Sequence, residues 1–449
     1  MRSVSRRKFL RTTAASALAA MPGYAFTQML AAPAAVLNDY RALVCVFMFG
    51  GNDAYNVVVP RSVLEYNVYA QSRQNLAIDQ ANLLPINPLT SDGTDYGLHP
   101  SMASLQTLFE SGAAAFVNNV GPLIEPTTKS QFQLQSVALP PQLFSHNDQQ
   151  DQWHSLRGNQ TSNTGWAGRM ADVLATGLGG QALPTNLSLF GSSLFQAASD
   201  TTAYVIGPAG PVEFVGFGDN GIFLEQRNAV EAILAAQYNT VYERAYRDVQ
   251  QRAVTNIDLV TAALEMAPTF NTVFPASQLG TQLETVAKLI AVSDVLQMQR
   301  QVFFVGVGGF DTHDDQLLLQ PGLLGGVADA MKAFYDATTE LAVADKVTSF
   351  TQSDFARTLT SNGDGTDHAW GGIQWVVGDA VRGREMYGQY PDLALASDDD
   401  VGGGRMIPTT SSDQFAATLA SWFGVGPAEL STIAPNLGNF SVGDLGFFL

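Results

Sequence analysis

Three short segments rich in apolar and β-branched residues are each followed, within a few positions, by an aspartate. The segments are Leu43–Phe49, Val302–Val307 and Val347–Phe350. Short runs of this kind, bounded by turn residues, are typical of strands buried on both faces of a parallel sheet. A further run, Ala113–Val120, follows helical spacing at 98–109, which indicates a strand–helix–strand unit. The pattern therefore predicts an α/β fold with a mainly parallel sheet and helices on both faces.

The remaining patterns predict further helices, one more strand and loops. Helical periodicity at 323–341 predicts a helix between the third and fourth strands, and Val376–Ala380 is a candidate fifth strand. Residues 224–299 are strongly helical and are predicted to form a helical insertion or cap. Residues 60–91 are polar, contain prolines and lack a periodic pattern, so we expect a loop there.

The N-terminal segment is typical of an export signal. Ser5–Arg11 (SRRKFLR) matches the twin-arginine motif, and the alanine-rich stretch after it is too short for a lasting membrane span. We expect a signal peptide over 1–35, export by the twin-arginine translocase to the periplasm or the medium, and one domain over 36–449. The alternative is a chance pair of arginines at the start of a cytosolic protein.

Charge and hydropathy exclude two classes of partner. The formal net charge is −18 at pH 7, so the chain would repel the phosphates of a nucleic acid. Beyond the leader, no stretch reaches the roughly 18 apolar residues of a membrane-spanning helix, so no stable membrane span is expected. The single cysteine, Cys45, allows no disulfide within the chain and lies in an apolar run, which favours a buried, structural role.

Acidic and imidazole side chains are concentrated after the third predicted strand. Asp311 and His313 follow a Gly-Gly turn, and in an extended backbone the side chains of an Asp-x-His tripeptide point the same way. Carboxylates and imidazoles are common ligands of divalent metal ions, so this pair is a candidate metal site. The alternative is an Asp–His hydrogen bond that braces the loop.

Two further motifs lie downstream. Asp354 follows the fourth predicted strand, and Arg357 could either pair with it or bind an anionic substrate. Asp367 and His368 precede a Trp-Gly-Gly turn. Because adjacent side chains of an extended segment diverge, one of this pair would bind a metal ion while the other orients it.

Two candidates lie earlier in the chain, each with a structural alternative. Asp53 follows the first strand and a Gly-Gly turn, where it would reach a site at the carboxyl edge of the sheet or accept hydrogen bonds from turn amides. Ser145 precedes a predicted helix, where it would act as a metal-activated nucleophile or as a helix N-cap.

Seven motifs, in this order, resemble one protein family over most of the chain. They are FGGNDAYNVVVP (49–60), LHPSM (98–102), SHNDQQDQWHS (145–155), TGWAGRM (164–170), GGFDTH (308–313), SDFART (353–358) and GTDHAWGG (365–372). Together with the twin-arginine start they resemble the domain-of-unknown-function family 1501. That family is similar to the alkaline phosphatase and sulfatase superfamily, which implies an alkaline-phosphatase-like three-layer α/β/α sandwich with a metal site at the carboxyl edge of its sheet.

The resemblance also implies roles for individual residues. It makes Ser145 the nucleophile and implies a set of metal ligands. The metal candidates are Asp53, Asp311, His313, Asp354, Asp367 and His368. Two bound metal ions would activate the nucleophile and neutralise a phosphate or sulfate. One departure is Phe355, which stands where the superfamily has a histidine after its aspartate.

Motifs and resemblance together predict an exported, metal-dependent hydrolase. Its substrate would be a small or polymeric phosphate ester, or a related anionic ester such as a sulfate. Zinc, calcium or magnesium would serve as cofactor, and Arg357 or Arg169 would steady the substrate anion. The alternative is a non-catalytic secreted or envelope binding protein on a degenerate hydrolase fold, which Phe355 and the scarcity of histidines favour.

Overall fold

The main sheet has nine strands and forms the centre of the molecule. The computed structural model describes residues 37, 39–211, 216, 218 and 220–449, so the predicted signal peptide lies outside the described residues. The strands follow one another across the sheet in the order β13-β5-β12-β9-β1-β8-β6-β7, with β14 beside β5. Their bounds are β1 (Arg41–Met48), β5 (Ala114–Gly121), β6 (Asn186–Ser188), β7 (Tyr204–Val205), β8 (Arg300–Val307), β9 (Val347–Ser353), β12 (Gly372–Val377), β13 (Met386–Tyr387) and β14 (Thr410–Ser411).

The sheet is mainly parallel, as predicted. Only β12 runs antiparallel to its neighbours β5 and β9, whereas β1 pairs in parallel with both β8 and β9. The fifth strand, predicted at 376–380, begins and ends earlier, at Gly372–Val377. Its polar residue Gln374 obscures the apolar pattern, but this side chain is satisfied inside the sheet because its Oε1 accepts a hydrogen bond from Thr351 at 2.8 Å.

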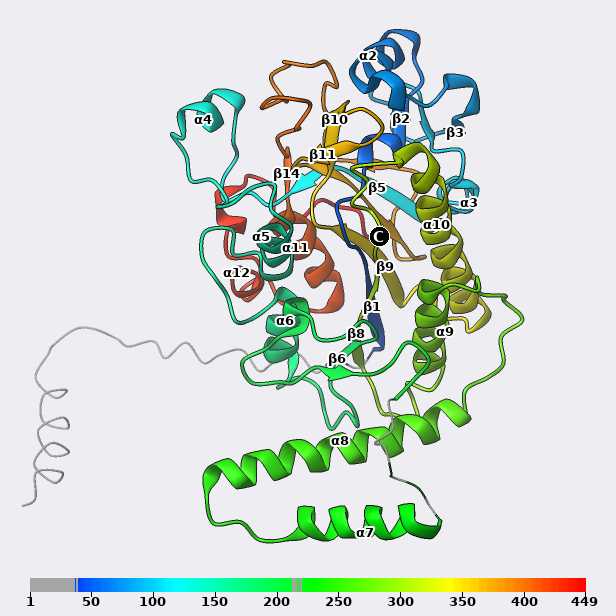
Figure 1. The fold of residues 1–449 in the computed structure, drawn as a ribbon, viewed down its shortest axis with the longest axis vertical. Coiled ribbons are helices and arrows are strands. Elements are labelled where there is room, and N and C mark those ends of the chain that lie inside the picture. Colours follow the sequence, from blue (N-terminus) through cyan, green and yellow to red (C-terminus); the bar gives the residue numbers. More distant parts are fainter. Residues whose placement is uncertain (1–36, 38, 212–215, 217, 219) are drawn as a thin grey trace, which may run out of the picture. The chain divides into compact units, whose positions relative to one another are not determined.

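Helices cover both faces of the sheet, which confirms the three-layer α/β/α arrangement (Figure 1). One face carries α3 (Ala103–Glu110), α9 (Gln278–Ala291) and α10 (Gln316–Glu340). The other face carries α5 (His146–Ser155), α6 (Trp166–Leu174), α11 (Ser412–Phe423) and α12 (Leu430–Ile433). Alternate residues of β1 enter the two cores: Val44 and Val46 pack with the first set of helices, and Cys45 and Phe47 with the second.

The prediction of a loop at 60–91 is wrong. This region contains the helix α2 (Val63–Arg73) and the strand β3 (Leu84–Ile86), which joins a small antiparallel sheet with β2 (Val58–Pro60) and β4 (Tyr96–Leu98). Among the residues of α2 only Tyr69, Ser72 and Arg73 are buried, so the helix has almost no apolar periodicity to read. Its stability comes instead from tertiary contacts such as the ion pair between Arg73 and Asp53.

The helical insertion contains three helices. α7 (Gly221–Ala235) and α8 (Val241–Glu265) pack against each other, and α8 also contacts α9. No residue of α7 is buried, and α8 buries only Val260 and Ala263. The insertion therefore covers the sheet mainly through α9. No helix in the part of the chain that the structure describes is long and apolar enough to cross a membrane.

A short hairpin stands at the carboxyl edge of the main sheet and positions the candidate site. It consists of β10 (Arg357–Ser361) and β11 (Thr366–His368), which pair antiparallel directly after β9. The remaining short elements are α4 (Lys129–Leu134), η1 (Ala54–Asn56), η2 (Gln74–Leu76), η3 (Gln80–Asn82), η4 (Leu194–Gln196) and η5 (Leu437–Asn439). Because parallel strands end at the same edge, the loops after β1, β8 and β9 meet beside this hairpin.

Candidate metal centre

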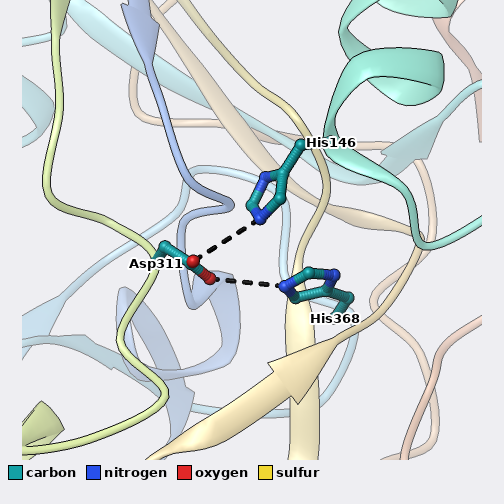
Figure 2. A group of neighbouring side chains, drawn as sticks. All are labelled: His146, Asp311 and His368. Carbon is teal, nitrogen blue, oxygen red and sulfur yellow. Dashed lines mark ion pairs between the residues drawn. The ribbon is translucent and has the colours of Figure 1, made fainter.

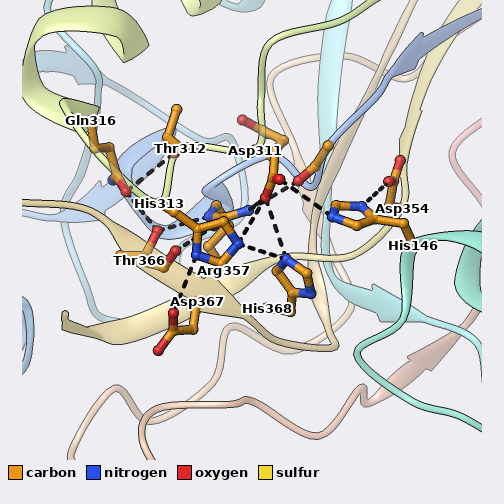
Figure 3. A network of polar contacts seen from close by, with 12 residues as sticks. His146, Asp311, Thr312, His313, Gln316, Asp354, Arg357, Thr366, Asp367 and His368 are labelled. Atoms are coloured by element: carbon orange, nitrogen blue, oxygen red, sulfur yellow. Dashed lines mark hydrogen bonds and ion pairs between the residues drawn. The ribbon is translucent and has the colours of Figure 1, made fainter.

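Four side chains from three separate segments converge at the carboxyl edge of the sheet (Figures 2 and 3). Asp311 and His313 follow β8, His368 ends β11, and His146 begins α5. The backbone loops approach closely here: a Cβ atom on Gly50, which has φ +114°, would lie 2.3 Å from the backbone nitrogen of Asp311. Only glycine fits that position, and this explains the Gly-Gly turn after β1.

The ring nitrogens of the three histidines lie around the Asp311 carboxylate. His146 Nε2 is 3.5 Å from Oδ2 of Asp311, and His368 Nε2 is 3.3 Å from Oδ1. One ligand atom from each of these three residues lies within 4.8 Å of the others. His313 joins them, because its Nε2 is 3.1 Å from Asp311 Oδ1 and 2.8 Å from His368 Nε2.

The ring of His146 is held by a buried carboxylate. Its Nδ1 lies 2.6 Å from Oδ2 of Asp354, and Gln150 donates to the same oxygen at 2.8 Å. These contacts leave His146 Nε2 facing Asp311, the carboxylate–histidine arrangement common around protein-bound metals. Oδ1 of Asp354 is buried without a hydrogen-bond partner among the described residues. Asp354 thus contacts the cluster through His146.

The ring of His368 is held by a backbone carbonyl. Its Nδ1 lies 2.7 Å from the carbonyl oxygen of Phe144, and because a carbonyl only accepts, Nδ1 carries the proton. Burial lowers the pKa of His368, which favours the neutral ring with a lone pair on Nε2. Phe144 itself has a left-handed backbone with φ +74°, and Gln149 Oε1 accepts its N–H at 2.5 Å.

Arg357 pairs with Asp311 rather than with Asp354. Its fully buried guanidinium donates to Asp311 Oδ1 at 2.8 Å, to the Gly50 carbonyl at 3.0 Å and to Thr366 Oγ1 at 2.9 Å. Burial would raise the pKa of Asp311, but the hydrogen bond and charge of Arg357 outweigh it and hold this pKa below its usual value. Asp311 is therefore ionised at neutral pH.

The structure places Asp53 beside Arg73. Asp53 is buried, and its Oδ2 accepts hydrogen bonds from Arg73 Nη2 and Gln316 Nε2. None of its contacts among the described residues is with a histidine of the cluster. It is connected to the cluster indirectly, because Gln316 also accepts a hydrogen bond from Thr366, which contacts Arg357 (Figure 3).

Three other predicted residues have different surroundings. Ser145 occupies the N-cap position of α5, but its hydroxyl donates to Asp148 Oδ2 at 2.6 Å and accepts no backbone N–H. Asp367 lies beside His313, with 3.3 Å between Oδ1 and Nδ1. Arg169 is buried elsewhere and donates to backbone carbonyls of α5, α12 and nearby loops.

His146 is the member of the cluster that the sequence did not predict. A pointer to it is Phe355, which follows Asp354 at a position where the resemblance described above leads one to expect a histidine. The Phe355 ring packs against His146 at 4.8 Å and against His368 at 4.5 Å between centroids. His146 therefore brings an imidazole from the start of α5 to a position against the Phe355 ring.

The donor set fits a borderline transition metal. Zinc sites in proteins use imidazole nitrogens and carboxylate oxygens, and zinc enzymes commonly have three protein ligands. The cluster offers three imidazoles and the Asp311 carboxylate, with the orientations of His146 and His368 fixed by Asp354 and the Phe144 carbonyl. Calcium and magnesium prefer sites built from oxygen, so they suit this set less well.

Comparisons with known proteins find one matching family and several solved structures with distant similarity. The family described as "Protein of unknown function (DUF1501)" matches residues 40–431. The structure of Ps i-CgsB in complex with k-i-k-neocarrahexaose is similar at 8% identity and a TM-score of 0.34, over 87% of this chain and 74% of that one. A structure described with the metabolism of multiple glycosaminoglycans by Bacteroides thetaiotaomicron is similar at 10% identity and 0.32, over 88% and 75%. No curated protein was found to match.

Proposed function

The chain belongs to the DUF1501 family, and we propose that it is a metal-dependent hydrolase of phosphate or sulfate esters. One observation carries the proposal: His146, Asp311 and His368 bring a ligand atom each to within 4.8 Å of one another at the carboxyl edge of the sheet. Sites in open α/β folds form at this edge. The His146 and His368 rings are each oriented by a contact at Nδ1. This arrangement is common around protein-bound metals, so it supports a metal centre better than an Asp–His contact that only stabilises the loop.

In this proposal His146, Asp311 and His368 hold one zinc ion, with His313 as a further ligand. A bound zinc ion would act as a Lewis acid on the ester and would lower the pKa of an attacking oxygen. Arg357 compensates the charge of Asp311 from the buried side, so the bound ion would leave a positively charged face toward the substrate. That charge favours an anionic ester over a neutral one.

Ser145 is the proposed nucleophile. Its hydroxyl donates to the Asp148 carboxylate at 2.6 Å, and that carboxylate could accept the proton as the oxygen attacks. Ser145 also precedes the first turn of α5, where the helix dipole stabilises developing negative charge. The neighbouring residue, His146, belongs to the metal cluster, so the serine backbone is fixed beside the centre.

A second candidate function is metal binding without catalysis, in an exported binding protein. The hydrogen bond from the Ser145 hydroxyl to Asp148 favours it, because Asp148 is not part of the cluster. A serine at the start of a helix can make such a bond for a purely structural reason. Phe355 favours it as well, because the resemblance leads one to expect a metal-binding histidine at this position. The two functions differ in turnover but not in metal content.

The test combines metal analysis with a panel of substrates. Protein expressed with supplied zinc is expected to hold about one equivalent, and His368→Ala is expected to hold far less. Turnover of phosphate or sulfate monoesters is expected in wild type and absent in Ser145→Ala, which should keep its metal. A chain without metal would refute both functions, and a metal-loaded chain without turnover on any ester would support the second.

A further inference from the structure

A loop with three consecutive glycines lies against the hairpin that carries His368. Gly402, Gly403 and Gly404 all have a positive φ, at +130°, +69° and +74°. The carbonyl of Gly404 accepts the backbone N–H of Leu359, in β10, at 3.1 Å. A Cβ atom on Gly404 would lie 2.4 Å from the Cβ atom of Leu359, so only glycine allows this approach. The loop is therefore fixed to one of the two strands of the hairpin.

A buried aspartate sets the path of this loop. Asp400 is 2% exposed. Its Oδ1 accepts the backbone N–H groups of Gly402 at 2.7 Å, Gly404 at 2.9 Å and Arg405 at 3.1 Å. An aspartate that accepts nearby backbone N–H groups stabilises a tight turn. Arg405 is thereby held at a defined point beside the hairpin, and we refer to Asp400–Arg405 as the glycine loop.

The side chain of Arg405 contacts both partners of the hydrogen bond that orients His368. Its Nε donates to the backbone carbonyl of His368 at 3.0 Å. Its guanidinium lies over the ring of Phe144, 5.3 Å from the centroid, where a cation is attracted to an aromatic face. Nδ1 of His368 in turn lies 2.7 Å from the carbonyl oxygen of Phe144. Arg405 therefore bridges the two segments that this hydrogen bond joins.

Phe144 depends on such support because its backbone is strained. A φ of +74° is unusual for a residue with a bulky side chain. Conformations of this kind persist only where the surrounding structure holds them. Here Gln149 accepts the Phe144 N–H at 2.5 Å, and Arg405 covers the ring. Relaxation of this backbone would move the carbonyl that accepts from His368.

We propose that Arg405 is a positioning residue of the metal centre, which fixes the orientation of the His368 ring through Phe144 and through the His368 backbone. The inference rests on the proposed function, because it takes His368 as a metal ligand. The other side-chain hydrogen bond of Arg405 among the described residues goes to the Gly402 carbonyl at 3.0 Å, within the glycine loop. Arg405 thus acts on the centre through His368 and Phe144.

The sign of the effect on zinc affinity separates positioning from charge. A positive charge near a metal ion repels it, so removal of the charge alone would tighten zinc binding. Loss of a residue that orients a ligand weakens metal binding instead, by about 10- to 100-fold. We expect that weakening in Arg405→Leu. Arg405→Lys keeps the charge but lacks the planar fork and its Nε donor, so it should also bind zinc more weakly than wild type.

Competition with a chromophoric chelator measures zinc affinity, and Arg41→Leu is the matched control. Arg41 makes the same two kinds of contact, since it donates to the Trp422 carbonyl and lies over the Trp422 ring at 5.5 Å. It begins β1, at the amino end of a strand whose carboxyl end faces the cluster. Arg41→Leu should therefore bind zinc like wild type. Wild-type or tighter binding in Arg405→Leu would overturn the inference.

A double variant tests whether the effect passes through His368. In His368→Ala the ring that Arg405 positions is gone, so adding Arg405→Leu should weaken zinc binding no further. A second loss as large as the first would overturn the inference, because Arg405 would then act on the centre by another route. Urea unfolding of each variant verifies that the affinities compare folded proteins.

A measurement on metal-free protein separates this inference from the proposed function. With an NMR-active nitrogen isotope in the five histidines, His368→Ala identifies the imidazole N–H signal of His368. The Nδ1–H that donates to Phe144 should be resolved in wild type and lost to exchange with water in Arg405→Leu. That loss would support the positioning role even if the protein held no zinc and turned over no ester. An unchanged signal would overturn the role and leave the metal centre intact.

Discussion

His146 and Asp354 lie 208 residues apart in sequence, yet Nδ1 of the one is 2.6 Å from Oδ2 of the other. The aspartate is fully buried at the end of β9, and the histidine reaches it from the first turn of α5. This pair joins the two sides of the proposed centre. It also gives Asp354 a role behind a proposed metal ligand, where the sequence motif had suggested direct ligation.

Removing that support is expected to weaken metal binding. Asp354→Leu keeps a side chain of similar size but frees the His146 ring to rotate, and zinc affinity should fall about 10- to 100-fold. Competition with a chromophoric chelator measures the change. Gln150→Met removes the other donor to Asp354 and should have a smaller effect, so equal losses in both variants would argue against orientation by the carboxylate.

Asp53 is expected to stabilise the fold rather than to bind metal. Asp53→Asn leaves Arg73 buried opposite a neutral group, and loss of one partner of a buried ion pair costs about 3–5 kcal/mol in the free energy of unfolding. Urea unfolding measures it. The double variant Asp53→Asn, Arg73→Met should recover part of the loss, because no charge then remains unpaired.

The metal content of Asp53→Asn tests whether Asp53 is structural or binds the metal. We expect it to equal that of wild type, since Asp53 contacts Arg73 and Gln316. A variant that unfolds like wild type but loses its zinc would place Asp53 at the metal and would refute the structural assignment.

His154 is expected to make the fold sensitive to acid. It packs among Phe47, Phe195 and Phe304, and burial lowers its pKa to about 3. Between pH 3 and its ordinary pKa of 6.5, the unfolded chain binds a proton at this residue that the folded chain does not. The contribution of neutral His154 to stability is therefore complete above pH 6.5 and is lost as the pH falls toward 3.

The comparison with His154→Phe isolates this effect. From pH 7.5 to 4.5 wild type should lose about 2.7 kcal/mol more of its free energy of unfolding than the variant does. This is the contribution of one proton, bound only by the unfolded chain, over the two pH units below the ordinary pKa of 6.5. Urea titrations at both pH values measure it. His99, whose pKa burial lowers to about 4, is present in both proteins and cancels. Parallel pH dependences would show that His154 is accessible to solvent protons in the folded state.

The proposed export depends on the arginine pair. Arg6→Lys with Arg7→Lys keeps the charge of the leader but removes the motif, so the protein should remain in the cytoplasm at full length. Fractionation of cells that express each form, with a cytoplasmic marker, measures it. Export of both forms to the same extent would exclude the twin-arginine route.

The sequence predicted the strands that bear the site better than the helices around it. β1 and β8 are continuous apolar runs, buried on both faces, so their pattern is visible in the sequence. α2 buries only three residues and depends on the pairing of Arg73 with Asp53, a contact between segments that no local pattern encodes. The start of β12 was missed because Gln374 interrupts its apolar pattern, and the hydrogen bond from Thr351 that satisfies this side chain is also a contact between separate segments.

Part of the candidate site was predicted, namely residues that lie in recognisable sequence motifs. Asp311 and His313 were identified because they follow a predicted strand, and His368 because it stands with Asp367 before a Trp-Gly-Gly turn. The member of the cluster that was missed, His146, lies at the start of a helix, where a cap residue is the ordinary expectation. Arg357 lies three residues from Asp354 in sequence but pairs with Asp311 in space, a contact between the start of β10 and the loop after β8 that sequence spacing does not reveal.

The spacing of the ligands along the chain has a consequence for the order of events during maturation. The proposed ligands at 146, 311 and 368 come together only after the sheet and α5 have assembled. A nascent chain would therefore offer no centre to load, and the ion would enter a domain that has already folded. If the chain crosses the membrane folded, the metal it carries outside would be selected by the ion concentrations inside the cell.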